Sequence, residues 1–208
     1  MSARINILRR FIIYMAILTF VMFTVWGFVR SFMNRPAGDY ETEVCDIRLK
    51  DKKYNQALEA ANNALKKTPN HRGALMCKSL VFISQKKYIE ANSELTYLIN
   101  YLKNNLEDDD RTGIGTLAAA YANRGIINDR NKNYEEALKD YIKALGIDHE
   151  AVAGPGLGTI ILNYKFKSSS VKERALYLNE QLQLPEEERI LSIKELDEGQ
   201  VMHKPGKL

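Results

Sequence analysis

The stretch YEEALKDYIKAL, residues 134–145, is the most informative part of the sequence, because it alternates small and aromatic side chains along one helical face. Tyr134, Ala137, Tyr141 and Ala144 follow one another at intervals of three and four residues. Residues at these intervals share one face of an α-helix. Small residues let two helices approach closely, and the aromatic side chains beside them fill the remaining space. The stretch therefore predicts a helix that packs closely against another helix.

Two earlier stretches have the same form, YNQALEAANNALKKTP from Tyr54 and YIEANSELTYLI from Tyr88. The interval from Tyr54 to Tyr88 is 34 residues, and the interval from Tyr88 to Tyr134 is 46, which is 34 plus 12. An ordinary amphipathic helical domain would also show apolar stripes, but it would not place the same residue types at a fixed offset. The chain therefore reads as a helical repeat with an insertion before its third unit, in which stacked helix pairs bury their apolar faces against one another.

A 34-residue period with this content resembles the tetratricopeptide repeat family, in which each repeat is two antiparallel helices. The third unit fits best, while the first has Ala61 where a large residue is usual. The second unit departs after its first turn, with Leu95, Leu98 and Ile99 at the later positions and Lys103 in place of Pro. The residues that define the repeats are Tyr54, Ala57, Ala64 and Pro69; Tyr88 and Ala91; and Gly125, Tyr134, Ala137, Tyr141 and Ala144.

We therefore expect an all-α protein, a short tetratricopeptide-like superhelix of about three helix pairs with C-terminal capping helices, following one transmembrane helix. The expected helices cover residues 39–50, 55–67, 72–85, 88–105, 114–130, 134–146, 170–182 and 186–197. The expected regions are a basic flank at 1–10, a membrane helix at 11–29, a linker at 30–37, repeats at 38–150 (38–71, 72–117 with the insertion, and 118–151), and a turn, capping helices and tail at 152–208.

The membrane helix is predicted from the uncharged run FIIYMAILTFVMFTVWGFV between Arg10 and Arg30. Its nineteen residues would form about 28 Å of helix, close to the hydrocarbon thickness of a bilayer. Trp26 and Phe28 suit the membrane interface. A cleaved secretory signal and a buried soluble helix are the alternatives. A retained anchor is favoured because the run is long and no small-x-small cleavage site follows it.

The flanking charges favour a cytoplasmic N-terminus. Three arginines precede the run (Arg4, Arg9 and Arg10), and two follow it (Arg30 and Arg35). The positive-inside rule therefore favours a cytoplasmic N-terminus by a narrow margin. We therefore expect a single-pass protein of the bacterial cytoplasmic (inner) membrane with its repeat domain in the periplasm. A cytoplasmic repeat domain is the alternative.

The charge balance excludes a nucleic-acid-binding domain. The chain carries 30 Lys and Arg against 26 Asp and Glu, but five of the arginines lie in residues 1–35, where there is no acid. Residues 36–208 then hold 25 basic and 26 acidic groups, without an electrostatic footprint for nucleic acid. The sequence also shows no catalytic constellation, no metal-ligand spacing among its histidines, and no cofactor motif. We expect no enzyme and no cofactor.

Several smaller features have plain structural interpretations. The run Asp108–Asp110 lacks the alternating ligands of a cation site and reads as a solvated helix end. AGPGLG (153–158) follows a helix and lacks the partners of a phosphate loop, so it reads as a turn. The serines of SSSVKERALYLNEQLQL begin a helix, Pro185 begins another, and GQVMHKPGKL (199–208) reads as a loose tail.

Cys45 and Cys77 fall on the first helices of neighbouring units, where they can face each other. Outside the cytoplasm a disulfide is permissible. Cysteine is also a common small core residue, and the geometric window for a bridge is narrow. The core role is favoured, and the bridge stays open.

In the family that the chain resembles, the first helices of the units line a groove that binds partner segments. Some members clamp a partner's C-terminal carboxylate there with basic and amide side chains. Here the matching positions hold Thr42, Asp46, Cys77, Ala119 and Asn123, so this clamp is absent. The expected groove residues are Thr42, Asp46 and Leu49; Met76, Leu80 and Ile83; and Ala122, Ile126, Asp129 and Arg130.

The centre of this lining is apolar, so it could take a peptide or an amphipathic helix of a partner protein. The alternative is that the chain's own C-terminal helix, or residues such as Leu191 and Ile193, covers it. The predicted function is a membrane-anchored scaffold or accessory subunit that contacts protein partners, including membrane subunits through the anchor helix. A periplasmic assembly factor or chaperone that holds clients in the groove is the alternative. The oligomeric state stays open.

Overall fold

The computed structural model describes residues 2–33, 35–152, 170–193, 197, 200 and 202–204. The chain divides into two compact units, Met1–Ala37 and Gly38–Leu208, and each is described by itself. The predicted turn at 153–158 lies outside the described residues.

The first unit is one long helix, α1 (Ser2–Met33), whose stretch Asn6–Arg30 has a mean hydropathy of 2.2. By length and composition this stretch can cross a membrane, and a signal sequence would meet the same criteria. The hydroxyls of Thr19 and Thr24 donate to backbone carbonyls about one turn earlier, at 2.7 and 2.8 Å. Both hydroxyls are therefore satisfied within the helix itself, without a partner helix.

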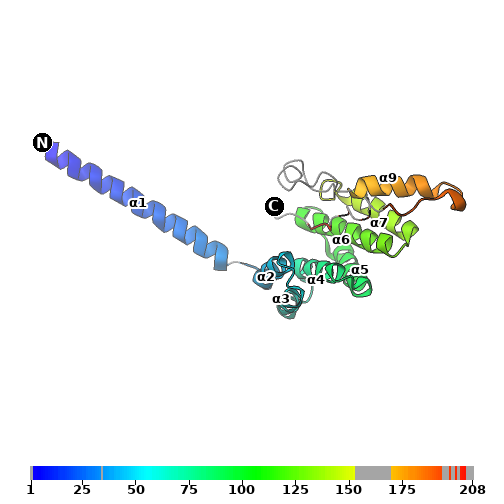
Figure 1. Ribbon diagram of the computed structural model, residues 1–208. Coiled ribbons are helices and arrows are strands. Elements are labelled where there is room, and N and C mark those ends of the chain that lie inside the picture. The colour runs from blue at the N-terminus through cyan, green and yellow to red at the C-terminus, as the bar shows by residue number, and fades with distance from the viewer. Residues whose placement is uncertain are drawn as a thin grey trace. The chain divides into compact units, whose positions relative to one another are not determined.

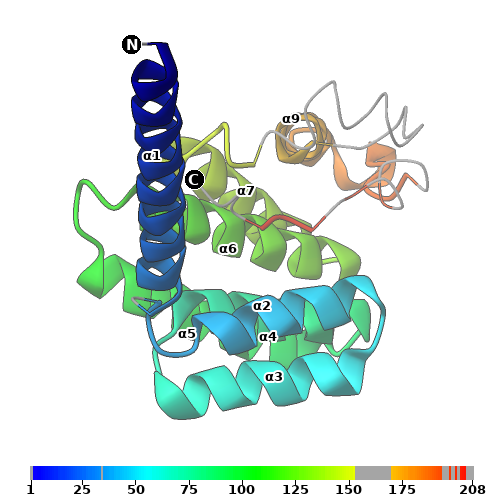
Figure 2. The same cartoon turned by 90° about the vertical axis from the view of Figure 1, so that its left-hand side faces the viewer.

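The second unit is built of helix pairs, and its described residues contain no strand. Consecutive pairs stack side by side in chain order, and the first helices of neighbouring pairs also touch (Figures 1 and 2). All six helices of the pairs begin and end within three residues of their predicted bounds. They are α2 (Asp39–Lys50) with α3 (Tyr54–Lys67), α4 (Arg72–Ser84) with α5 (Tyr88–Asn105), and α6 (Arg111–Arg130) with α7 (Tyr134–Ile147).

Each pair turns at a lysine in the left-handed conformation: Lys52, Lys86 and Lys132 have φ of 59°, 59° and 63°. In every turn the lysine amide donates to a carbonyl three residues earlier. The next amide donates to a carbonyl five residues earlier, at 2.8 to 2.9 Å. These two bonds form a Schellman motif, which satisfies the last carbonyls of the first helix. The lysines are 34 and 46 residues apart, as the tyrosines are, so the helix pairs recur with the period read from the sequence.

Small residues bring the paired helices together. A Cβ atom at Gly125 on α6 would lie 2.6 Å from the ring of Tyr141 and 3.3 Å from the carbonyl oxygen of Ala137, both on α7. Such distances are shorter than van der Waals contact, so only glycine allows this approach. On the second helices, small residues that face inward are fully buried: Ala57, Ala64, Ala91, Ala137 and Ala144.

The insertion lengthens α5 to 18 residues and moves the start of α6 to Arg111, three residues before the predicted start. Asp110 caps α6, because its carboxylate accepts a hydrogen bond from the amide of Gly113 at 2.8 Å. The same carboxylate pairs with Arg72 on α4. The last aspartate of the acidic run is therefore a helix cap that is tied to the preceding pair.

Cys45 on α2 and Cys77 on α4 form a disulfide, with their Cα atoms 6.4 Å apart. The expectation that they are separate core residues was wrong. Both side chains are fully buried in a small cluster with Val81 and the alanines of α3. Because the first helices of neighbouring units touch, their inward residues come within bridging distance.

Beyond the pairs, α9 (Val171–Leu182) packs against α7, and Ser170 caps it in a capping box with Glu173. The predicted helix 186–197 is wrong over residues 189–193. Residues 186–188 form a short 3₁₀ turn, η1 (Glu186–Glu188), and residues 189–193 are not helical. The amide of Ile190 donates to the side chain of Gln181 at 2.7 Å, and the Ile190 carbonyl accepts from the Tyr177 hydroxyl. Side chains of α9 thus take the backbone bonds that a helix would need.

Candidate binding face for an extended peptide

The predicted groove residues lie on α2, α4 and α6, which we call the first-helix face. Most of them are buried, including Met76, Leu80, Ile83 and Ile126 at 1 to 4 % exposure. Of the two alternatives left open by the sequence, the burial of these side chains fits the one in which the chain's own C-terminal residues cover the stripe. The remaining members are Thr42, Ala122 and Asp129, which are buried; Asp46 and Leu49, which are partly buried; and Arg130, which is exposed.

Described residues near the end of the chain lie on this face. Leu191 and Met202 pack against the hydrophobic cluster that contains the predicted stripe. Part of the chain's end runs along α6 (Figure 2). We call its described residues the C-terminal segment: Gln200, Met202, His203 and Lys204. The interpretation of residues 199–208 as a loose tail was wrong for these four residues, since the contacts described below hold them in place.

The centre of the segment is held by its backbone. The side-chain amide of Asn123 on α6 accepts a hydrogen bond from the His203 amide at 2.8 Å and donates to the His203 carbonyl at 2.6 Å. Asn123 is fully buried, and its nitrogen also lies 3.5 Å from the sulfur of Met76 on α4. One side chain thus pairs with the N–H and C=O of a single residue, as a neighbouring strand would.

The two ends of the segment bind at opposite ends of the repeat array. The ammonium group of Lys204 pairs with the carboxylate of Asp46 on α2. The amide nitrogen of Gln200 donates to Asp129 on α6 at 2.6 Å and to the Tyr141 hydroxyl at 3.2 Å. The segment therefore crosses from the third unit to the first, against the order of the units in the chain.

Asp129, one of the predicted groove residues, belongs to a buried ion pair. Its two carboxylate oxygens accept hydrogen bonds from Arg174 on α9, both at 2.7 Å. Arg174 is fully buried, and it also donates to the Leu191 carbonyl at 2.9 Å. The hydroxyl of Tyr141 donates to Asp129 at 3.2 Å. Burial and the Asp129 charge together raise the pKa of Tyr141 well above its usual range, so this hydroxyl stays a donor.

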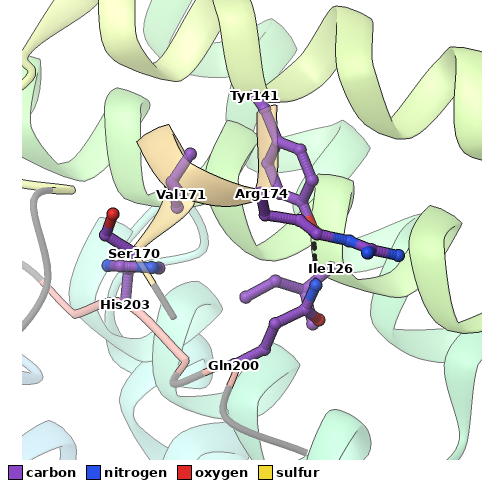
Figure 3. Close-up of a pocket in the computed structure, with 7 residues that line it drawn as sticks. All are labelled: Ile126, Tyr141, Ser170, Val171, Arg174, Gln200 and His203. Atoms are coloured by element: carbon purple, nitrogen blue, oxygen red, sulfur yellow. Dashed lines mark hydrogen bonds between the residues drawn. The ribbon is translucent and has the colours of Figure 1, made fainter. Parts of the chain in front are cut away.

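His203 is one of the residues that line a small pocket beside this ion pair (Figure 3). The pocket is lined by residues of three helices and of the C-terminal segment, and its side chains leave no space for a water-sized ligand. Burial lowers the pKa of His203 from 6.5 to about 4, so its imidazole is neutral at pH 7. The lining residues are Ile126, Tyr141, Ser170, Val171, Arg174, Gln200 and His203.

The structure brings some of the predicted residues together and adds others. Four of the predicted groove residues contact the C-terminal segment or its immediate surroundings: Asp46, Met76, Ile126 and Asp129. Arg130 faces solvent. The sequence did not single out Arg174, Gln200, His203 or Lys204. The sequence could have indicated Asn123, because it is a polar residue directly after the run Ala118–Ala122 on a helix that faces inward.

Among the described residues, no group of three or more His, Cys, Asp or Glu side chains could hold a metal ion. The charged groups around His203 are instead used in ion pairs. The arrangement can bind an extended backbone, a small ring and a cation.

Comparison with known proteins identifies the class. Residues 118–150 match the family model described as Tetratricopeptide repeat. No curated protein sequence matches the chain. One similar solved structure is the first TPR of Spaghetti (RPAP3) bound to the HSP90 peptide SRMEEVD, with a TM-score of 0.50 and 16 % identity over 71 % of this chain and 94 % of that one. Another is the Arabidopsis OM64 TPR domain, with a TM-score of 0.45 and 17 % identity over 62 % of this chain and 93 % of that one.

The fold is all-helical and repetitive, and the matched region covers most of α6 and all of α7. Residues 118–150 therefore match a tetratricopeptide repeat, and the helix pairs have the fold of tetratricopeptide repeat domains. Domains of this class are protein–protein interaction modules.

Proposed function

We propose that this chain is a membrane-anchored interaction module that holds an extended segment of a partner protein on its first-helix face. The observation that carries the proposal is the pairing of the Asn123 side chain with both backbone groups of His203. A buried amide placed in this way recognises an extended chain by its backbone, whatever protein supplies that chain.

The membrane part of the proposal rests on α1. The stretch Asn6–Arg30 is long enough and apolar enough to span a bilayer, and a retained anchor would keep the repeat domain at the membrane surface. The internal hydrogen bonds of Thr19 and Thr24 remove one reason to expect a partner helix in the membrane. The repeat domain is thus the better candidate for contacting partners.

The compartment is proposed from chemistry as well as charge. The Cys45–Cys77 disulfide favours an oxidising environment, such as the bacterial periplasm. More arginines precede the apolar run than follow it, and by the positive-inside rule this also favours a repeat domain outside the cytoplasm. We therefore place the domain in the periplasm, anchored to the inner membrane.

Two roles fit such a module, a scaffold subunit of a membrane complex and an assembly factor that holds clients transiently. The sequence alone offered little reason to prefer the second role. The first-helix face favours it, because the C-terminal segment already fills this face and a partner would have to displace it. An acidic peptide such as the SRMEEVD bound by the Spaghetti domain is not the ligand we propose. Asp46 would repel it.

The test is a mild-detergent pull-down of the tagged full-length protein, with mass spectrometry of the bound proteins. Asn123→Leu keeps the side-chain size and removes the backbone pairing. Asn62→Leu, an exposed position on α3, is the matched control. We expect partner proteins that remain bound to the Asn62→Leu variant and are lost from the Asn123→Leu variant. Partners that bind both variants equally would place the interaction elsewhere and refute the proposal.

A further inference from the structure

We infer that the C-terminal segment is a built-in competitor, and that the natural ligand of the first-helix face is an extended segment in which a basic residue directly follows a histidine or similarly small ring. This inference rests on the proposed function and names the chemistry of the partner. Three observations carry it: the backbone pairing at Asn123, the enclosed position of His203 and the carboxylate of Asp46.

The backbone pairing excludes a helical ligand at this point. The N–H and C=O of His203 both bond to Asn123, at 2.8 and 2.6 Å. In the interior of an α-helix these groups are already bonded within the helix, and only the end turns leave them free. A bound helix could not offer both groups from one residue. The ligand is therefore extended where it crosses α6, in contrast to the amphipathic helix that the apolar stripe indicated.

The enclosed position of His203 against α6 suits a neutral ring of imidazole size. His203 is 7 % exposed, and the pocket that it lines has no room for a water-sized group. On the domain side of this pocket, Ile126 and Val171 are apolar and Ser170 is polar. The charged Arg174 in the lining is paired with Asp129 and Asp197. Because Arg174 is already paired, a charged side chain of the ligand would find no opposite charge here, so a neutral ring is favoured.

Asp46 selects a cation at the next ligand position. Lys204 is its only ion-pair partner among the described residues. The second carboxylate oxygen of Asp46 is buried and has no hydrogen-bond partner in the described part of the chain. When the C-terminal segment leaves, this carboxylate loses its cation and is partly buried. A basic ligand residue restores the pair.

The segment is attached to the domain that it occupies, so a partner has to displace it. Docking within one chain acts at an effective concentration on the order of 1 mM for a short connection. If the free segment binds with a Kd of about 0.1 mM, the docked form excludes roughly 90 % of the sites and weakens a competitor about tenfold. The fold thereby keeps the first-helix face covered until a better ligand arrives.

The experiment measures binding of a fluorescent peptide, GQVMHKPGKL (residues 199–208), to the full-length protein in detergent. The double variant His203→Pro/Lys204→Glu releases the segment, because proline has no amide hydrogen for Asn123 and glutamate is repelled by Asp46. We expect this variant to bind the peptide at least tenfold more tightly than the unsubstituted chain. Adding Asn123→Leu should abolish the binding, and adding Asn62→Leu should leave it unchanged.

Two further measurements sharpen the result. A peptide with Lys204→Glu should bind the released variant at least tenfold more weakly, and equal binding would overturn the basic-residue inference. Light scattering should find the unsubstituted chain monomeric. A dimer that dissociates with His203→Pro/Lys204→Glu would show the segment binding a second copy, which overturns competition within one chain.

Failure of this inference is distinct from failure of the proposed function. If the released variant does not bind the peptide, the inference is wrong, and Asn123→Leu can still remove natural partners in the pull-down. If the peptide binds as expected but natural partners ignore Asn123→Leu, the competitor is real and the proposed function is wrong.

Discussion

The first and third repeat units use equivalent backbone positions for different purposes. Cys45 and Gly125 each precede the tyrosine of their unit by nine residues. In the third unit this position stays empty so that Tyr141 can pack against the helix, while in the first it forms a disulfide to Cys77. Cys77 and Asn123 are likewise equivalent, each eleven residues before its tyrosine. One repeated site therefore provides a covalent link in the second unit and a ligand contact in the third.

The two ends of the array are also secured differently. At the N-terminal end the disulfide joins α2 to α4. At the C-terminal end the Asp129–Arg174 ion pair joins α6 to α9, with Arg174 fully buried. A covalent link and a buried ion pair respond to different perturbations, so each end can be disturbed separately.

Arg174→Met should be the most damaging substitution at the C-terminal end. It leaves the buried carboxylate of Asp129 without its cation, which costs about 3–5 kcal/mol in free energy of unfolding. Chemical denaturation of the full-length protein in detergent measures this loss. Adding Asp129→Leu should recover much of it. Lys139→Met, which removes an exposed ion pair on α7, should cost far less than Arg174→Met, because solvent screens that pair. Equal losses for Arg174→Met and Lys139→Met would contradict the structural role of Arg174.

Breaking the disulfide should be the largest perturbation at the N-terminal end. The two cysteines are 32 residues apart, and closing a loop of this length stabilises a fold by about 3–4 kcal/mol. Denaturation with and without a thiol reductant measures the difference. The double variant Cys45→Ala/Cys77→Ala should show the same loss and no further response to reductant. An unsubstituted chain that is indifferent to reductant would rule out the link.

Gly125→Ala tests the close approach in the third unit. The added methyl group would lie 2.6 Å from the Tyr141 ring, and the resulting shift should cost about 1–3 kcal/mol. Gly146 on α7 is the matched control, because nothing lies within 4 Å of a Cβ atom there. Gly146→Ala should raise stability by about 0.5–1 kcal/mol through helix propensity. Effects of the same sign at both glycines would show that α6 and α7 are not packed as described.

Lys86→Gly should have the smallest effect, and a favourable one. Lys86 has φ of 59°, a conformation that costs a side-chain-bearing residue about 1 kcal/mol and glycine nothing. Thermal unfolding should show a rise in stability of up to about 1 kcal/mol. Lys87→Gly, one position later, serves as the control and should not stabilise the fold. A loss of stability with Lys86→Gly would argue against the Schellman turn.

The helical repeat was predictable because its evidence is local and recurs. Tyr54, Tyr88 and Tyr134 place the same residue types at the same offsets, and this spacing determines which helices pair. The covering of the first-helix face was not predictable in the same way. Asn123 and His203 are 80 residues apart, and no periodic pattern links them. The pairing of Lys204 with Asp46 is equally non-local, since either could have stayed in solvent.

Two wrong expectations have one physical cause, the dominance of tertiary contacts over local preference. Residues 186–197 have a good helix start, but the side chains of Gln181 and Tyr177 bond the backbone of Ile190 and keep it out of a helix. Cys45 is small and apolar enough for an ordinary core position, yet its place opposite Cys77 follows only from the contact of α2 with α4.

The central claim is that the C-terminal segment is docked on the first-helix face, and the titration of His203 by NMR tests it most directly. His71, His149 and His203 are the only histidines, so the His203→Gln variant assigns the signal. Burial lowers the pKa of the docked imidazole to about 4, against 6.5 for an ordinary histidine. Protonation therefore opposes docking, which is fully present above pH 6.5 and is about 30-fold weaker at pH 5.

We predict that the His203 signal of the full-length protein titrates well below pH 6.5, because docking and protonation compete. In the Asn123→Leu variant, where the backbone pairing is lost, the same signal should titrate near pH 6.5. A pKa of about 6.5 in the unsubstituted chain would mean that His203 is in solvent, and it would contradict the account.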